Sequence, residues 1–193
     1  MEQDYVQEKK FEKDNFTVEP LPKGEYEDCI FRNCDFSNSD LTEVKFLDCE
    51  FIGCNLSMAI LKKTTFRDVK FKNCKMLGLL FEHCHEYGFT VSFDNCILNY
   101  SSFYQKKIKK TSFKDSQLHE VEFSDCDLTG SVFSNCDLLS AKFENTVLEK
   151  VDFRTSFNYS IDPDFNRVKK AKFSMPEVVG LLNKYDIDID KTT

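Results

Sequence analysis

The sequence predicts an all-β solenoid, in which five-residue units wind the chain around one continuous core. Two observations support this prediction. An apolar residue recurs at every fifth position over most of the chain, and a small residue recurs two positions before it. A helix has 3.6 residues per turn and an ordinary strand alternates with a period of two, so neither produces an apolar period of five. Self-similarity at a fixed period is typical of repeat architectures.

The central apolar position of the repeat is filled in 25 of 25 units, in two registers. The first register consists of Tyr26, Phe31, Phe36, Leu41, Phe46, Phe51, Leu56, Leu61, Phe66, Phe71, Met76 and Phe81. The second consists of Phe93, Leu98, Phe103, Ile108, Phe113, Leu118, Phe123, Leu128, Phe133, Leu138, Phe143, Leu148 and Phe153. These residues are predicted to stack into the core.

The second inward position holds mostly Cys, Ser, Thr, Ala or Val, and all 9 cysteines occupy it if Cys84 is included. Within each register the cysteines are separated by multiples of five residues, whereas zinc sites use two to four. We therefore interpret the cysteines as reduced, buried packing residues and predict neither a metal site nor a cofactor. Lys106 is the anomaly at this position, and we expect it to turn outward or to distort its coil.

The second residue after each centre is rich in Asn, Asp and Gly, which tolerate positive φ. A short extended piece followed by such a corner would turn the chain after every repeat. The residues of these types at this position are Asn33, Asn38, Asp48, Gly53, Asp68, Asn73, Gly78, Asn95, Asp115, Asp125, Gly130, Asn135 and Asn145.

Three segments resemble the A(D/N)LXX units of the pentapeptide-repeat family: CDFSNSDL at 34–41, CNLSMAIL at 54–61 and CDLTGSVF at 126–133. The resemblance covers residues 26–153. It implies a right-handed quadrilateral β-helix with four repeats per coil, so that residues 20 apart stack and the 25 repeats make about six coils.

Residues 31–66 are most similar to the N-terminal half of the quinolone-resistance members of that family. Those members are dimers that bind DNA gyrase or topoisomerase IV by mimicking duplex DNA. The resemblance therefore implies a non-catalytic protein with a protein partner and quinolone protection as its function. It implies no catalytic residue.

Three segments interrupt or flank the 26–173 β-helix. The register slips by two between Phe81 and Phe93, so residues 83–91 should form a bulge. Residues 1–25 keep the apolar register but place Lys9, Asp14 and Glu19 at the small position, which predicts an N-terminal cap. Residues 174–193 are predicted to form a short C-terminal helix and tail that either cover the last coil or pair two chains.

The C-terminal helix is predicted from a capping-box pattern at 174–177 and from four apolar residues on one helical face. These residues, the candidate dimer interface, are Val178, Leu181, Leu182 and Tyr185. The resemblance to the quinolone-resistance members favours pairing through this segment, and closure of the chain's own last coil is the alternative.

Composition limits the remaining function classes. The net charge of −7 and the pI of about 5.1 disfavour direct binding to nucleic acid or to an anionic membrane. The sequence has no apolar segment of the length of a signal peptide or membrane span, so we expect a cytoplasmic protein. It has only 3 His and no phosphate-binding loop or nucleophile motif, so we do not expect an enzyme.

Two outward surfaces are candidates for binding a partner. A candidate acidic face, which DNA mimicry would require, consists of Asp40, Glu43, Glu82, Glu122, Asp125 and Glu144. A candidate apolar patch for a protein partner consists of Met58, Ile60, Leu77, Leu80, Ile97, Tyr100 and Tyr104. Lysines 107, 109, 110 and 150 lie on another face, so a continuous acidic surface is not predicted.

Overall fold

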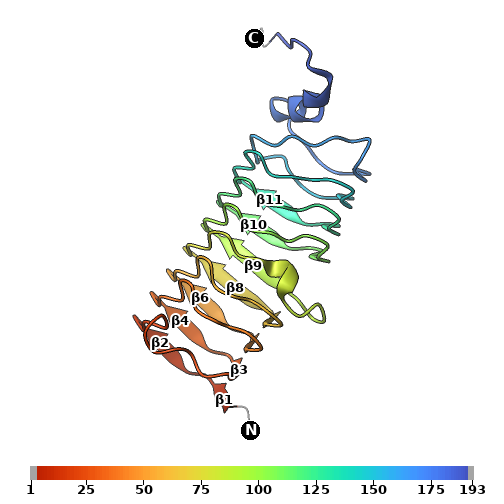
Figure 1. Cartoon of the computed structure of the whole chain (residues 1–193). Helices are drawn as coiled ribbons and strands as arrows, with labels where there is room; N and C mark the ends of the chain where they lie inside the picture. The colour runs from red at the N-terminus through yellow and green to blue at the C-terminus, as the bar shows by residue number, and fades with distance from the viewer. Residues whose placement is uncertain (1–3, 191–193) are drawn as a thin grey trace.

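A computed structural model describes residues 4–190 as a stack of coils along one axis (Figure 1). Residues 1–3 and 191–193, the outermost parts of the predicted terminal segments, lie outside the described residues. Eleven short strands and three 3₁₀ turns are formed: β1 (Asp4–Gln7), β2 (Lys10–Glu12), β3 (Gly24–Glu27), β4 (Ile30–Arg32), β5 (Lys45–Leu47), β6 (Glu50–Ile52), β7 (Thr65–Arg67), β8 (Val69–Lys72), η1 (Phe81–His83), β9 (Val91–Asp94), β10 (Ser112–Lys114), β11 (Val132–Ser134), η2 (Glu177–Leu181) and η3 (Asn183–Tyr185).

The strands pair in parallel with a register of 20 residues, which confirms the predicted all-β quadrilateral β-helix with four repeats per coil. We name its faces in chain order. Face A carries the sheet β1-β3-β5-β7, and face B carries the sheet β11-β10-β9-β8-β6-β4-β2. On faces C and D, isolated bridges join successive coils. They run from Asn15↔Asp35 to Asp137↔Phe157 on face C and from Asp40↔Ile60 to Glu122↔Lys142 on face D.

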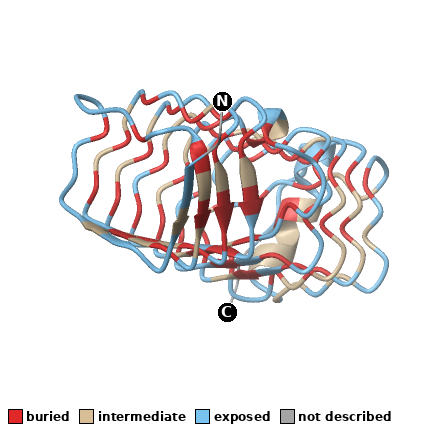
Figure 2. Ribbon diagram, turned by 90° about the horizontal axis from the view of Figure 1, so that it is seen from below, coloured by how far each residue is buried: buried red, intermediate tan, exposed pale blue. Residues whose placement is uncertain are grey.

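The predicted central residues form the core, and all 25 are buried. Along face B they form an uninterrupted column of phenylalanine rings, each stacked on the next with centroids 4.6–5.5 Å apart. This column contains Phe11, Phe31, Phe51, Phe71, Phe93, Phe113, Phe133, Phe153 and Phe173. Figure 2 shows the buried positions recurring along every coil between exposed corners. The stack therefore extends beyond the 25 predicted repeats at both ends.

The small inward residues do more than fill space. In many of them the Sγ or Oγ atom donates a hydrogen bond to the carbonyl oxygen 23 residues earlier, on the preceding coil. Cys49 donates to Tyr26 over 3.2 Å, and Thr64 donates to Leu41 over 2.7 Å. A buried carbonyl left without a partner is costly, so this position favours a small side chain that carries a donor.

The corners take positive φ at the second residue after 23 of the 25 centres, as predicted, and the exceptions are His83 and Thr155. Asn and Asp occupy many of these corners, but Glu43, Met58, Lys63 and Tyr100 adopt the same conformation, with φ of 56–65°. Such residues rarely adopt it by themselves. The stacked backbone hydrogen bonds of neighbouring coils impose it.

The register slip between Phe81 and Phe93 is confirmed, because β8 pairs with β9 at a spacing of 22 residues, as in Val69↔Val91. The two extra residues lie in the predicted bulge, residues 83–91, which begins in η1 and brings Phe89 into the core. The bulge is visible beside β9 in Figure 1.

Lys106 contradicts both sequence-based expectations. It does not turn outward, since it is only 5% exposed, and its backbone keeps the regular hydrogen bonds to Phe103 and Asp127. Its Nζ donates to the carbonyl oxygen of Cys84 over 2.6 Å and lies 5.2 Å from the centroid of the Phe89 ring. Lys106 therefore ties the bulge to the next coil. Burial lowers the pKa of this ammonium.

The two ends of the stack differ. At the N-terminal end, β1 and β2 pair with β3 and β4, so residues 4–25 wind as a first coil whose outer edge is open. At the C-terminal end, the short helix is of the 3₁₀ type, η2 and η3. The predicted capping box is wrong, because Pro176 occupies the N-cap of η2 and no side chain caps it. Among residues 4–190, no helix is long and apolar enough to cross a membrane.

Candidate partner-binding surface

Face D and its corner with face C carry most of the candidate apolar patch. Ile60 and Leu80 point outward from face D on successive coils and are 51% and 41% exposed. Met58 and Tyr100, at the C–D corner, are 58% and 60% exposed. Leu77 is half-buried at the same corner, where its carbonyl oxygen accepts from the N–H of Met58. These five residues therefore lie on three consecutive coils.

Gly78 makes room for this arrangement. Its φ is +63°, a conformation that residues with a side chain rarely adopt, and a Cβ at this position would lie 2.6 Å from the Met58 sulfur. The thioether can therefore lie across the corner above Gly78. Met is a flexible and polarizable side chain that adapts to different apolar contacts. An exposed methionine on the same coil as the exposed Ile60 favours binding to a protein surface.

The last two members of the predicted apolar patch lie at its margins. Ile97 is on face C, paired with Lys75 and Gln117, and is half-buried. Tyr104 is at the D–A corner and is 41% exposed. The nearby carboxylate of Asp125 raises the pKa of the Tyr104 hydroxyl, by charge and by hydrogen bonding.

The six candidate acidic residues also belong to face D and the D–A corner, but they form two groups. Asp40 and Glu43 lie before the apolar residues, and Glu122, Asp125 and Glu144 lie after them. The sixth, Glu82, lies in η1, and its Oε2 atom is buried without a hydrogen-bond partner among the described residues. The structure therefore separates the acidic face into two acidic margins around an apolar centre.

Neighbouring lysines reduce the charge of both margins. Glu43 lies 3.8 Å from the ammonium groups of Lys23 and Lys63, and Glu122 lies 4.0 Å from that of Lys142. Ion pairs this exposed contribute little to stability, but they reduce the local negative charge that a basic partner would meet.

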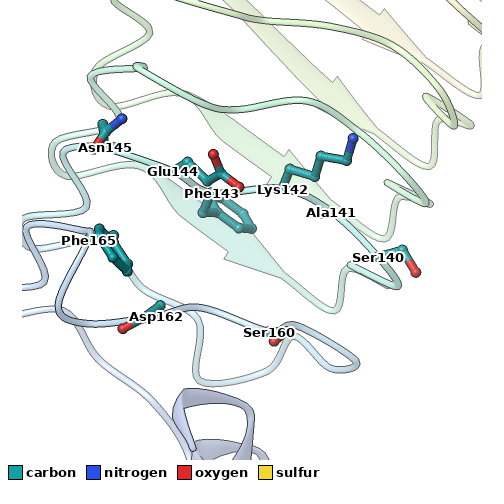
Figure 3. Close-up of a pocket in the computed structure, with 9 residues that line it drawn as sticks. All are labelled: Ser140, Ala141, Lys142, Phe143, Glu144, Asn145, Ser160, Asp162 and Phe165. Atoms are coloured by element: carbon teal, nitrogen blue, oxygen red, sulfur yellow. The ribbon is translucent and has the colours of Figure 1, made fainter. Parts of the chain in front are cut away.

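A groove at the C-terminal end of face D was not predicted. It has a volume of about 660 Å³ and lies between residues 140–145 and a loop at 160–165 (Figure 3). Phe143 and Lys142 line one side, and Asp162 and the 66% exposed Phe165 line the other. The only sequence signal for it is the failure of the repeat at Asn158 and Pro163. The groove extends the apolar and charged character of face D by two coils.

The candidate dimer residues divide between the core and the surface. Leu181 is half-buried and packs against the core, and the carbonyl of Gly180 accepts from the N–H of Ile161. Leu182 and Tyr185 are 39% and 56% exposed. Segment 174–190 therefore covers part of its own last coil and leaves Leu182 and Tyr185 outward, together with Met175, Ile187 and Ile189. Pairing through this segment stays a prediction.

Comparison with known proteins agrees with this geometry. The family model described as pentapeptide repeat region matches residues 25–87 and 88–157, which is more than half of the chain. A search of the curated proteins finds no match.

Two solved structures of trypsin-treated variants of QnrB1, a plasmid-mediated fluoroquinolone resistance protein, have a similar fold. They give TM-scores of 0.61 and 0.57 at 18% and 17% sequence identity, and each comparison covers 97% of this chain and 98% of the other. At this identity the likeness shows the fold alone. The repeat period, the four-faced coil and the family model all agree, and the chain belongs to the pentapeptide-repeat family.

Proposed function

We propose that this chain is a non-catalytic binding protein whose partner docks on face D. The observation that supports this proposal is the row of exposed apolar side chains on consecutive coils, Met58, Ile60, Leu80 and Tyr100. A contiguous apolar patch with a charged margin is typical of protein-binding sites. In the rest of the solenoid most outward positions are polar, so this face is the best site for a partner.

We further propose DNA gyrase or topoisomerase IV as the partner, with protection against quinolones as the outcome. The likeness of the fold to a fluoroquinolone resistance protein and the similarity of residues 31–66 to the quinolone-resistance members support this choice. The two acidic margins would face the basic DNA-binding surface of the enzyme. The apolar centre would supply most of the affinity, because the carboxylates are partly neutralised by lysines.

The proposal predicts the effect of two double variants on gyrase supercoiling in the presence of a quinolone. Ile60→Glu with Tyr100→Glu should remove protection, with at least a tenfold loss of binding, because it places charge in the apolar centre. Glu122→Lys with Asp125→Lys should weaken binding only a few-fold and reduce its dependence on salt. Val132→Glu, a similar change at an exposed position on face B, is the matched control and should have no effect.

Different outcomes separate the parts of the proposal. If the acidic reversal abolishes protection and the apolar variant retains it, the partner is bound through the carboxylates, as DNA mimicry requires, and the apolar centre is not the binding site. If the wild-type chain neither binds nor affects gyrase or topoisomerase IV at about 10 µM, a concentration that detects even weak complexes, these enzymes are not the partner.

A further inference from the structure

The corner between faces A and B carries opposite charges in its two halves. Each coil contributes two outward residues there. On the first four coils these include the acidic edge, which we define as Glu8, Glu27, Asp28, Asp48 and Asp68. On the four coils after the bulge they include the basic edge, which we define as Lys109, Lys110, Lys150, Lys169 and Lys170. One arginine in the first half and one glutamate in the second leave net charges of −4 and +4.

The two edges have the same length, and the basic edge carries charge on three of its four coils, because Thr129 and Gly130 occupy the corner of the second one. Backbone hydrogen bonds from Glu8 to Glu27, from Asp28 to Leu47 and from Asp48 to Arg67 place the acidic corners directly on one another. The basic corners are stacked in the same way, from Lys110 to Thr129 and on to Lys169. With about 4.8 Å between coils, each edge is about 14 Å long.

Most of these charges form no ion pair with another described residue. Glu8, Asp28, Asp48 and Asp68 are exposed and form no ion pair within residues 4–190. The same holds in that range for Lys110, Lys150, Lys169 and Lys170. By contrast, Lys109 is paired with Asp127 over 2.9 Å. Each edge thus offers four unneutralised charges of one sign.

The bulge lies midway between the two edges. Its Gly88 packs near the side chain of Arg67, at the corner of the fourth coil, and its Glu86 pairs with Lys107 of the sixth coil over 3.4 Å. Tyr87 is 86% exposed, the most exposed large apolar side chain among residues 4–190. A two-fold axis through the bulge would exchange the coil of Asp68 with that of Lys110.

We propose that two copies of this chain pair antiparallel along the A–B corner, with the two-fold axis at the bulge. The acidic edge of each copy then faces the basic edge of the other. In this arrangement Asp68 lies opposite Lys110, Asp28 opposite Lys150 and Glu8 opposite Lys170. Tyr87 of both copies lies at the centre, where aromatic residues contribute most to an interface. The contact is isologous and closes at two copies.

A second copy fits these observations better than a polyanion does. A polyanion on the basic edge would meet the acidic edge two coils away, at about 10 Å, which is about one Debye length at 0.1 M salt. It would also approach a molecule of net charge −7. A second copy supplies charge of the opposite sign over the same length, opposite three of the four acidic coils.

Charge reversal tests this pairing directly. Sedimentation velocity on the full chain, up to about 500 µM protein, should show a monomer–dimer equilibrium at low salt that shifts at least tenfold toward monomer in about 0.5 M salt. Asp28→Lys with Asp68→Lys should abolish pairing, and so should Lys110→Glu with Lys150→Glu. A mixture of these two variants should form a heterodimer, and the variant with all four changes should pair with itself again.

The substitutions are compatible with the fold, because Glu and Lys already occupy such positive-φ corners at Glu43 and Lys63. Glu12→Lys with Lys72→Glu, at the B–C corner, is the matched control and should leave pairing unchanged. The proposal is wrong if the wild-type chain is a monomer at low salt, or if association is insensitive to salt and to both reversals, as pairing through the C-terminal segment would be. It is also wrong if heparin, used as a polyanion probe, binds the basic edge of a chain that does not self-associate.

Discussion

Replacing Phe123 with alanine is expected to lower the free energy of unfolding by about 3 to 5 kcal/mol. The ring is fully buried and stacks between Phe103 and Phe143, with centroid distances of 5.3 and 5.1 Å. It also makes edge contacts with Phe113 and Phe133. A coil confined by stacked neighbours on both sides cannot collapse into the space left by a phenyl ring, so the cavity persists. Urea denaturation of both chains measures the difference.

Phe165→Ala is the matched control, because this phenylalanine is 66% exposed outside the stack. It should change the free energy of unfolding by less than about 0.5 kcal/mol. A loss below about 1 kcal/mol for Phe123→Ala would contradict the assigned core register, since no buried phenylalanine in a close-packed core is removed at so small a cost.

The core could be predicted from the sequence because one strong signal determines it. Every fifth residue must face inward, so counting from Tyr26 and from Phe93 identifies the buried side chains without knowledge of the coil shape. The two-residue slip between Phe81 and Phe93 also identifies the bulge, because only an insertion can restore the same period in a new register. These conclusions depend only on the five-residue period of the sequence.

The contacts of individual polar side chains could not be predicted in this way. Lys106 was expected to leave the core or to distort its coil, but the bulge exposes the carbonyl of Cys84 at the point that its ammonium reaches. That contact joins residues 22 apart, and the period does not encode it. The sequence likewise does not show that lysines one coil away, Lys23 and Lys142, lie within 4.0 Å of Glu43 and Glu122. Such pairings depend on rotamers.

The C-terminal segment shows a different limit. Residues 174–177 have the pattern of a capping box, yet Pro176 is the N-cap and η2 is a 3₁₀ turn. The close approach of Gly180 to Tyr159 determines this geometry, since a Cβ on Gly180 would lie 2.1 Å from the Tyr159 carbonyl oxygen. A tertiary contact therefore overrides the local helix signal.

Eight of the nine cysteines, all except Cys84, are expected to react with thiol reagents at least about 1,000 times more slowly in the native chain than in the unfolded chain. All nine are buried, with exposures of 5% or less. The reactive species is the thiolate, and burial raises the pKa of Cys49, Cys126 and Cys136 to about 12. At pH 8 such a thiol is ionised in about one molecule in 10,000, against about one in four at the unfolded pKa of about 8.5.

Cys96 differs from the others, because a hydrogen bond from Cys74 lowers its pKa. It is only 1% exposed, so a thiolate there is still closed to a reagent. Cys84 is the thiol expected to react first. It borders the bulge and a small open groove lined by Glu82, Glu86 and Lys106, and a local opening of the bulge would expose it without unfolding the stack.

Labelling with a chromogenic disulfide at pH 8, followed by mass spectrometry of the modified peptides, measures both expectations. A native sample should lose at most one thiol quickly, at Cys84, and Cys84→Ser should leave eight slow thiols. In denaturant all nine thiols should react at the rate of the unfolded chain. Rapid reaction of eight or nine thiols in the native chain would contradict their inward position, because only side chains on the outer faces of the coils combine an ordinary pKa with free access to the reagent.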